Sequence, residues 1–116
     1  MSGIVLNTNQ KNIYEEILNF LKSDEKSYHF DMHPGYGKIT ILIYLLNNIE
    51  NYKKINIIFY NILLKSEFEN NIININYIGN NDNIDENKKQ IVGSLKKIDN
   101  MDLYITLTST LVTFLK

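Results

Sequence analysis

The chain has 116 residues, with 12 lysines against 13 acidic residues, a net charge of −1, and neither arginine nor cysteine. The lack of cysteine excludes disulfides, thiolate zinc sites and a cysteine nucleophile, and the lack of arginine excludes an arginine finger from within this chain. A nearly neutral chain with a pI of about 6.1 lacks the excess of positive charge that is typical of a dedicated nucleic-acid-binding domain. The 19 isoleucines and 18 asparagines are typical of a protein translated from an AT-rich genome.

The first half of the chain predicts a helix, a short strand, a tight loop and a second helix. Apolar residues recur at Ile13, Ile17 and Phe20, which is the spacing of one helix face, and Asn9 is the expected N-cap. The next expected elements are a strand over 27–33, a loop over 34–37 and a helix over 39–49.

The second half continues the alternation of strands and helices. The pattern predicts strands over 55–60, 73–78 and 103–108, a helix over 64–72, a loop over 79–87, a short helix over 91–98 and the start of a helix at 111–115. Alternating elements of this kind indicate right-handed crossovers in one α/β domain, with a mainly parallel sheet between two helical layers, a three-layer αβα arrangement. No apolar run is long enough to span a bilayer and no secretory signal opens the chain, so we expect a soluble, cytoplasmic protein without a membrane partner.

One motif carries chemistry, and it lies between a predicted strand and a predicted helix, where a phosphate-binding P-loop belongs. Gly35 and Gly37 allow the backbone to form a nest of amides, and Lys38 would compensate the charge of the β- and γ-phosphates of ATP. The positive end of the following helix would add to this field. The residues assigned to the phosphate loop are Pro34, Gly35, Tyr36, Gly37, Lys38, Ile39 and Thr40.

This motif departs from the full P-loop pattern at two positions. Met32 stands where the pattern has glycine, and Ile39 stands where a serine or threonine normally ligates Mg²⁺. Thr40 would supply the hydroxyl only if the first helical turn shifted by one residue. The competing interpretation is a glycine-rich turn between strand and helix with an exposed lysine.

The segment MHPGYGKI resembles motif I of the superfamily 2 helicases. The resemblance implies a P-loop NTPase-like, RecA-like fold that binds ATP and, with it, Mg²⁺. Leu6 to Gln10 resembles the segment that precedes motif I in this family, in which the glutamine reads the adenine edge. Gln10 lies 28 residues before Lys38, a suitable interval.

The resemblance extends downstream and implies contacts with nucleic acid, either DNA or RNA. The segment INIIFYNILLKSEFENNI resembles motif Ia and its helix, and DLYITLTSTLVTFL resembles the strand that carries the next nucleic-acid-tracking motif. By this resemblance, Thr106, Thr108 and Ser109 would donate hydroxyl hydrogen bonds to backbone phosphate. The most similar helicases are those of restriction enzymes, of transcription and repair factors, and of large cytoplasmic DNA viruses such as poxviruses.

The hydrolytic machinery is missing from the 116 residues. No Asp-Glu-x-His motif occurs, and none of the three adjacent acidic pairs directly follows a buried strand. We therefore assign no catalytic residue. We interpret residues 1–116 as a single partial RecA-like domain, a helicase ATP-binding segment that would not hydrolyse ATP alone and would partner the rest of a helicase.

Two other functions compete with the ATP-binding helicase segment. A non-catalytic α/β interaction module derived from a helicase would bind a protein partner through its open sheet edge. A small P-loop kinase is disfavoured, because the chain shows no basic lid and no acid for an acceptor site. His29 and His33 share a strand face but have no third ligand, so no metal site is predicted.

Overall fold

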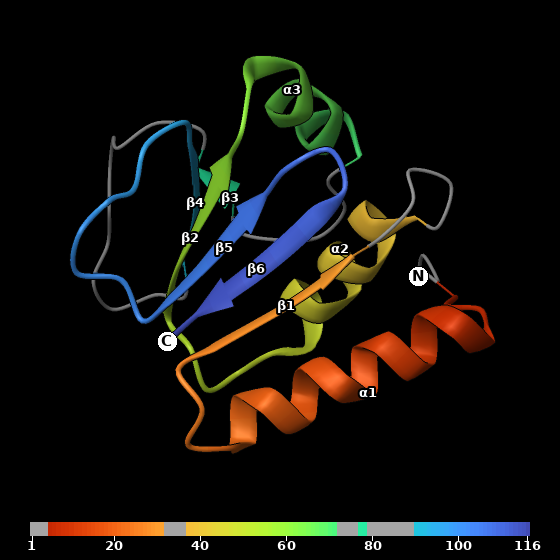
Figure 1. Ribbon diagram of the computed structural model, residues 1–116. Coiled ribbons are helices and arrows are strands. Elements are labelled where there is room, and N and C mark those ends of the chain that lie inside the picture. Colours follow the sequence, from red (N-terminus) through yellow and green to blue (C-terminus); the bar gives the residue numbers. More distant parts are fainter. Residues whose placement is uncertain (1–4, 32–36, 72–76, 79–89) are drawn as a thin grey trace.

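The computed structural model describes residues 5–31, 37–71, 77–78 and 90–116, which form three helices and one six-stranded sheet (Figure 1). In chain order the elements are α1 (Thr8–Lys22), β1 (Ser27–Asp31), α2 (Lys38–Asn48), β2 (Lys54–Phe59), α3 (Ile62–Asn70), β3 (Tyr77–Ile78), β4 (Gln90–Ser94), β5 (Leu103–Leu107) and β6 (Leu111–Leu115). The expected helices near 13–21, 39–49 and 64–72 and the strands near 27–33, 55–60 and 103–108 are thus confirmed. Of the strand expected over 73–78, Tyr77–Ile78 forms β3 and the rest lies outside the described residues, as does the loop expected over 79–87.

The sheet is mixed, which corrects the expectation of a mainly parallel one. The strand order is β1-β6-β5-β2-β4-β3. β2 pairs in parallel with β4 and β5, and β3 pairs in parallel with β4. β6 runs antiparallel to both of its neighbours, β5 and β1. The antiparallel pair β5–β6 is possible because three residues, 108–110, join the two strands as a tight hairpin instead of a crossover helix.

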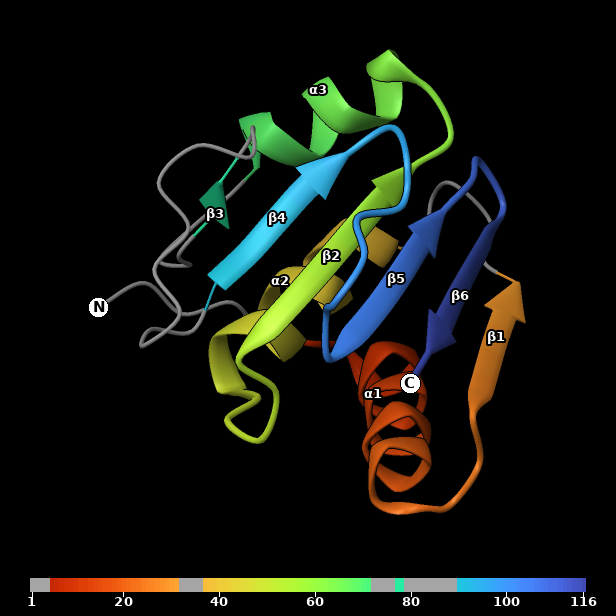
Figure 2. The ribbon, with the colours of Figure 1, turned by 90° about the vertical axis from the view of Figure 1, so that its left-hand side faces the viewer.

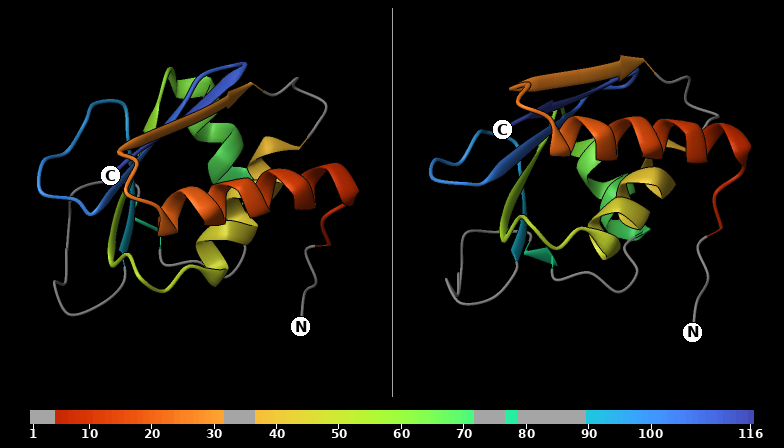
Figure 3. Two further views of the ribbon diagram at one scale, coloured as in Figure 1. Left: turned by 60° about the horizontal axis from the view of Figure 1, so that its bottom comes forward. Right: turned by 90° about the horizontal axis from the view of Figure 1, so that it is seen from below.

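The three described helices all lie on one face of the sheet, so the expected three-layer αβα arrangement is wrong for this part of the chain (Figures 2 and 3). Phe20 of α1 contacts Phe114 of β6 at a ring-centroid distance of 6.3 Å. Phe68 of α3 contacts Phe59 of β2 at 5.5 Å, and both belong to the same buried cluster as the apolar face of α2. The molecule is therefore built from one helical layer over a curved sheet, with one main core between them.

The helix α1 is fixed at both ends by polar groups. Its N-cap is Asn7 rather than the expected Asn9, because Asn7 and Gln10 form a reciprocal capping box. The Asn7 Oδ1 accepts from the Gln10 amide and the Gln10 Oε1 accepts from the Asn7 amide, each at 2.9 Å. At the other end, the Lys116 ammonium donates to the carbonyl oxygens of Phe20 at 2.8 Å and Ser23 at 2.7 Å. A cation here also suits the negative end of the helix dipole.

Two expected helices are strands. Residues 90–94 form the buried strand β4 between β2 and β3, where a helix over 91–98 was predicted. Residues 111–115 form β6, where Leu111, Phe114 and Leu115 had suggested a helix. In both segments the apolar spacing fits a helix, but β-branched residues and the pairing on both sides of each strand favour the sheet.

The second face of the sheet is covered by segment 95–102 over β2 and β4 rather than by a helix (Figure 3). Asn56 of β2 is fully buried and holds this segment. Its Nδ2 donates to the Val92 carbonyl and the Ser94 hydroxyl, both at 2.9 Å, and its Oδ1 accepts from the Ile98 amide at 2.9 Å. No described helix is long and apolar enough to cross a membrane.

Candidate functional site

The carboxyl ends of β1, β2 and β5 meet at one edge of the sheet, from which α2 and α3 begin (Figure 1). Tyr60, directly after β2, donates its amide to the carbonyl of Leu107, the last residue of β5, at 2.9 Å. Asp31 at the end of β1 lies in register with Leu111. Ligands of α/β proteins bind in this position, outside the carboxyl ends of the strands.

Gly37 is the N-cap of α2 and has a left-handed backbone, with a φ of 71°. No side-chain oxygen caps the amides of the first turn of this helix. The first helical hydrogen bond runs from the Ile41 amide to the Gly37 carbonyl, at 3.2 Å. Uncapped first-turn amides and the helix dipole form an anion-binding arrangement, and glycine adopts the required φ without strain.

Two of the predicted site residues gather around Gly37. A Cβ built on Gly37 would lie 2.6 Å from the Gln10 Nε2 and 3.7 Å from the Thr40 Oγ1. The fold therefore brings Gln10, from the first turn of α1, against the loop that precedes α2. Ile39 instead packs against the hydrophobic core, so the hydroxyl nearest Gly37 belongs to Thr40, one position later than in the full P-loop pattern.

Replacing Gly37 with alanine is expected to lower the free energy of unfolding by about 1–2 kcal/mol, because an L-residue is strained at positive φ. The new methyl group would also displace the Gln10 amide. Urea unfolding gives the stability, and the Gln10 side-chain NMR resonances report the displacement. A Gly37→Ala protein with unchanged stability and an unmoved Gln10 would contradict this geometry.

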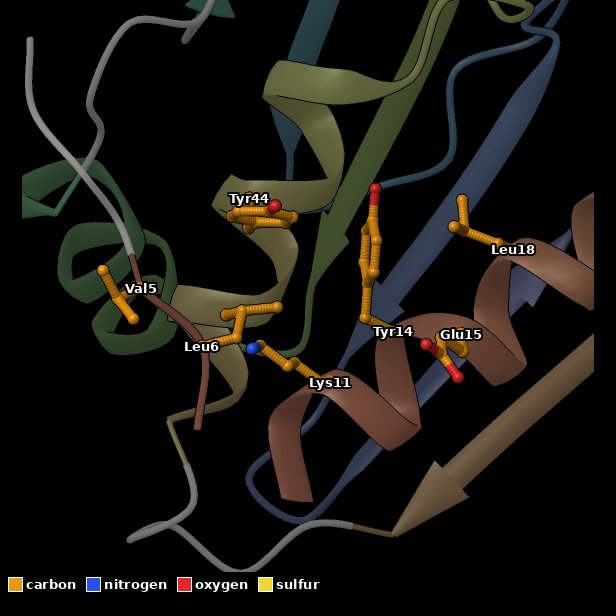
Figure 4. A pocket seen from close by; sticks show the side chains of 7 residues that line it. All are labelled: Val5, Leu6, Lys11, Tyr14, Glu15, Leu18 and Tyr44. Carbon is orange, nitrogen blue, oxygen red and sulfur yellow. The ribbon is translucent and has the colours of Figure 1, made fainter. Parts of the chain in front are cut away.

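A groove of about 460 Å³ opens between α1, α2 and the segment before α1 (Figure 4). Tyr14 and Tyr44 form an edge-to-face pair there, with ring centroids 5.0 Å apart and an interplanar angle of 86°. Burial, and secondarily the neighbouring Tyr44, raise the pKa of the Tyr14 hydroxyl, which therefore stays protonated near neutral pH. The lining residues are Val5, Leu6, Lys11, Tyr14, Glu15, Leu18 and Tyr44.

This groove and the contact at Gly37 are built from the same two helices, α1 and α2. Tyr14 is one helical turn after Gln10, and Tyr44 is one turn after Thr40, so each tyrosine lies on the same helix face as a residue that contacts Gly37. One turn is about 5.4 Å along the axis. The uncapped first turn of α2 and an aromatic groove are thus carried by the same pair of helices. Sequence reasoning missed both tyrosines, although their spacing of four from Gln10 and Thr40 was a usable signal.

The other predicted residues lie in several places. Pro34, Gly35 and Tyr36 fall outside the described residues, and Lys38 is the first residue of α2. Thr106 pairs with Thr113 across β5 and β6, and its side chain is on the sheet face away from the helices. The Thr108 hydroxyl is used inside the hairpin, where it accepts from the Leu111 amide at 2.9 Å. Ser109 is exposed at the tip of this hairpin.

Comparison with known proteins identifies a family for the chain. Residues 3–115 match the family model described as type III restriction enzyme, res subunit. No curated protein and no solved structure matches the chain. The match covers the capped start of α1, the Gly37 turn and the whole described sheet.

Proposed function

Because the chain belongs to the type III restriction enzyme res subunit family, a family of helicase-like ATP-binding domains, we propose that it binds ATP at the start of α2. The observation that carries the proposal is the left-handed Gly37, whose turn is uncapped and is contacted by Gln10 and Thr40. The first-turn amides and Lys38 would hold the β- and γ-phosphates. Thr40 offers the hydroxyl oxygen that fits Mg²⁺, a cation that prefers oxygen ligands and arrives with the phosphates.

The base of the nucleotide would occupy the groove of Tyr14 and Tyr44. Aromatic side chains stack on nucleobases, and the spacing of one helical turn from Gly37 suits a ligand that joins phosphates to a base. Gln10 contacts Gly37 and lies one helical turn before Tyr14, so it belongs to both parts of the proposed site. Its Oε1 is held by the capping box. Nε2 would then be the hydrogen-bond donor to the adenine edge.

We further propose that the chain alone holds ATP without hydrolysing it. Hydrolysis requires an acid that holds Mg²⁺ at the end of a strand beside the P-loop. β5 ends at Leu107 and is followed by Thr108 and Ser109, which carry hydroxyl groups instead of carboxylates. Neither hydroxyl replaces the charge of that acid.

Isothermal titration calorimetry with ATP, with and without Mg²⁺, tests this function. Lys38→Ala is expected to abolish detectable binding, because a lysine beside the phosphates compensates their charge. The matched control is Lys53→Ala, since Lys53 is exposed and precedes β2 at the opposite edge of the sheet. Tyr44→Ala is expected to weaken ATP binding about fivefold or more, with inorganic tripolyphosphate unaffected.

Three outcomes would contradict the proposal. They are no binding at high ATP, equal losses in Lys38→Ala and Lys53→Ala, and steady release of phosphate by the unmodified chain. Loss of tripolyphosphate binding in Tyr44→Ala would contradict the placement of the base alone.

Contact with nucleic acid is proposed at the same edge, next to the nucleotide. Ser109 is exposed at the tip of the β5–β6 hairpin, and Tyr60, which follows the neighbouring strand β2, is 73% exposed. A non-catalytic interaction module is the second candidate function. It is favoured by Ile39, a partly buried apolar residue that stands directly after Lys38 in place of a serine or threonine. Failure of the ATP titration would select this second function.

A further inference from the structure

The strand β1 forms one end of the sheet, and its outer edge has no partner among the described residues. The Lys116 amide donates to the Lys26 carbonyl at 2.9 Å, so Lys26 and Lys116 are a hydrogen-bonded pair next to the β1–β6 ladder. Antiparallel pairs alternate between bonded and non-bonded residues, so Tyr28 and Phe30 bond to β6. The backbone N–H and C=O groups of Ser27, His29 and Asp31 therefore point away from the sheet.

A groove of about 400 Å³ lies between α1 and β1, beside this open edge. It is lined by Glu16, Asn19, Phe20, Ser23, Glu25 and Tyr28. Burial first, and then the charge and hydrogen bonding of Glu16, raise the pKa of the Tyr28 hydroxyl, so the Glu16 carboxylate lies next to that ring. Two carboxylates, Glu16 and Glu25, are among the lining residues and no lysine is, although the Lys116 ammonium lies against Phe20 and Ser23.

We propose that β1 and this groove bind an extended, lysine-bearing segment of a partner protein. The segment would add to the sheet as a further strand, using the outward backbone groups of Ser27, His29 and Asp31. Side chains alternate along a strand, so every second residue of the segment would point toward the helix side. There its ammonium groups would meet Glu16 and Glu25.

The structure already contains an ammonium in the neighbouring position. Lys116 Nζ lies 4.4 Å from the centroid of the Phe20 ring and donates to the carbonyl oxygens of Phe20 and Ser23. Phe20 and Ser23 also line the groove. The Phe20 and Ser23 carbonyl oxygens already accept from Lys116, so the lysine side chains of the segment would be bound by the Glu16 and Glu25 carboxylates.

A basic partner fits this surface better than a second copy of the chain does. The β1 strand reads SYHFD, which has no lysine to place against Glu16 and Glu25 when two copies pair within this segment. It carries Asp31 instead, so self-pairing brings further negative charge to the edge. Nucleic acid is disfavoured for the same reason, because its phosphates would face the two carboxylates.

The test uses an acetylated, amidated seven-residue peptide of alternating threonine and lysine, labelled for fluorescence anisotropy, with the full chain. Changing Glu16→Gln and Glu25→Gln together is expected to weaken binding about five- to tenfold, as two partly exposed ion pairs are lost. The matched control is Glu50→Gln with Glu67→Gln, which changes the net charge equally at exposed positions outside the groove. A peptide with glutamate in place of lysine should not bind.

Amide hydrogen exchange locates the peptide. Binding should slow exchange at Ser27, His29 and Asp31, and methylation of the peptide nitrogens on one edge should abolish both the binding and the protection. Equal weakening in the two double variants would overturn the proposal, as would protection that appears elsewhere. Protection of these three amides without peptide, together with a dimer in size-exclusion chromatography, would assign the edge to a second copy instead.

Discussion

Replacing Phe114 with alanine is expected to lower the free energy of unfolding by about 3–5 kcal/mol, the usual cost of removing a buried aromatic ring. Phe114 is fully buried on β6. Its ring lies 6.3 Å from that of Phe20 and 6.2 Å from that of Phe30, measured between centroids. The substitution would leave a cavity between α1 and the strands β1 and β6 at the end of the sheet. Packed neighbours relax only partly into such a space.

The neighbouring Leu115→Ala is the matched control and also tests the secondary structure. Leu115 is 39% exposed and lies on the opposite face of β6, so its replacement is expected to cost less than about 1 kcal/mol. In a helix, Phe114 and Leu115 would share the buried face with Leu111, and both losses would be large. Urea denaturation of the two variants, followed by far-UV circular dichroism, separates the two cases. Similar losses in both variants would contradict the strand.

Replacing Asn56 with leucine is expected to cost about 2–4 kcal/mol, although leucine is more apolar and similar in size. The Asn56 side chain donates to Val92 and Ser94 and accepts from the Ile98 amide. Leucine would leave these buried polar groups without their partner. Segment 95–102 would also lose the hydrogen bond that holds it over β2.

The control for this substitution is Asn48→Leu, since Asn48 is exposed and makes one side-chain hydrogen bond, to the Tyr44 carbonyl at 2.7 Å. Its cost is expected to stay within about 0.5 kcal/mol. Urea unfolding gives the two stabilities, and hydrogen exchange at the Ile98 amide should accelerate in Asn56→Leu alone. A stable Asn56→Leu protein with a protected Ile98 amide would contradict the assigned network.

Elements with strong local patterns could be predicted from the sequence. The stripe of Ile13, Ile17 and Phe20 gives α1, and the apolar run of β2 gives a strand buried in the centre of the sheet. These segments succeed because a local pattern and the final packing favour the same structure. Asn9 was the wrong N-cap because Asn7, but not Asn9, is three residues before a glutamine that can complete the capping box.

The strands β4 and β6 were not predicted, because strand pairing decides them against an apolar spacing that fits a helix, and apart from the β5–β6 hairpin this pairing is distant in the sequence. Ile91 and Val92 become a strand by pairing with β2, which is more than 30 residues earlier. Val112 and Phe114 pair with β1, more than 80 residues earlier. The same two segments explain why the helices lie on one side only. Each was expected to be a helix that covers the sheet, and each is a strand within it.

The candidate site was predictable where the motif was local. The sequence pattern placed a glycine turn before α2, and the structure gives Gly37 its left-handed backbone there. The proximity of Gln10 to Gly37 came only from the resemblance to helicases, since no local rule joins residues 27 positions apart. The groove of Tyr14 and Tyr44 was missed because it forms only when α1 and α2 pack together.

The contacts of Lys116 with α1 have a consequence for the order of folding. Lys116 bonds to Phe20 and Ser23, which are 96 and 93 positions away, and β1 finds its only described partner in β6. The parallel pairs β2–β4 and β2–β5 join segments that are closer in the chain, and they lose less loop entropy on closing. During synthesis, β1 therefore emerges long before its described partner β6. β1 then waits with both of its edges open, and the new chain is exposed to mispairing during this interval.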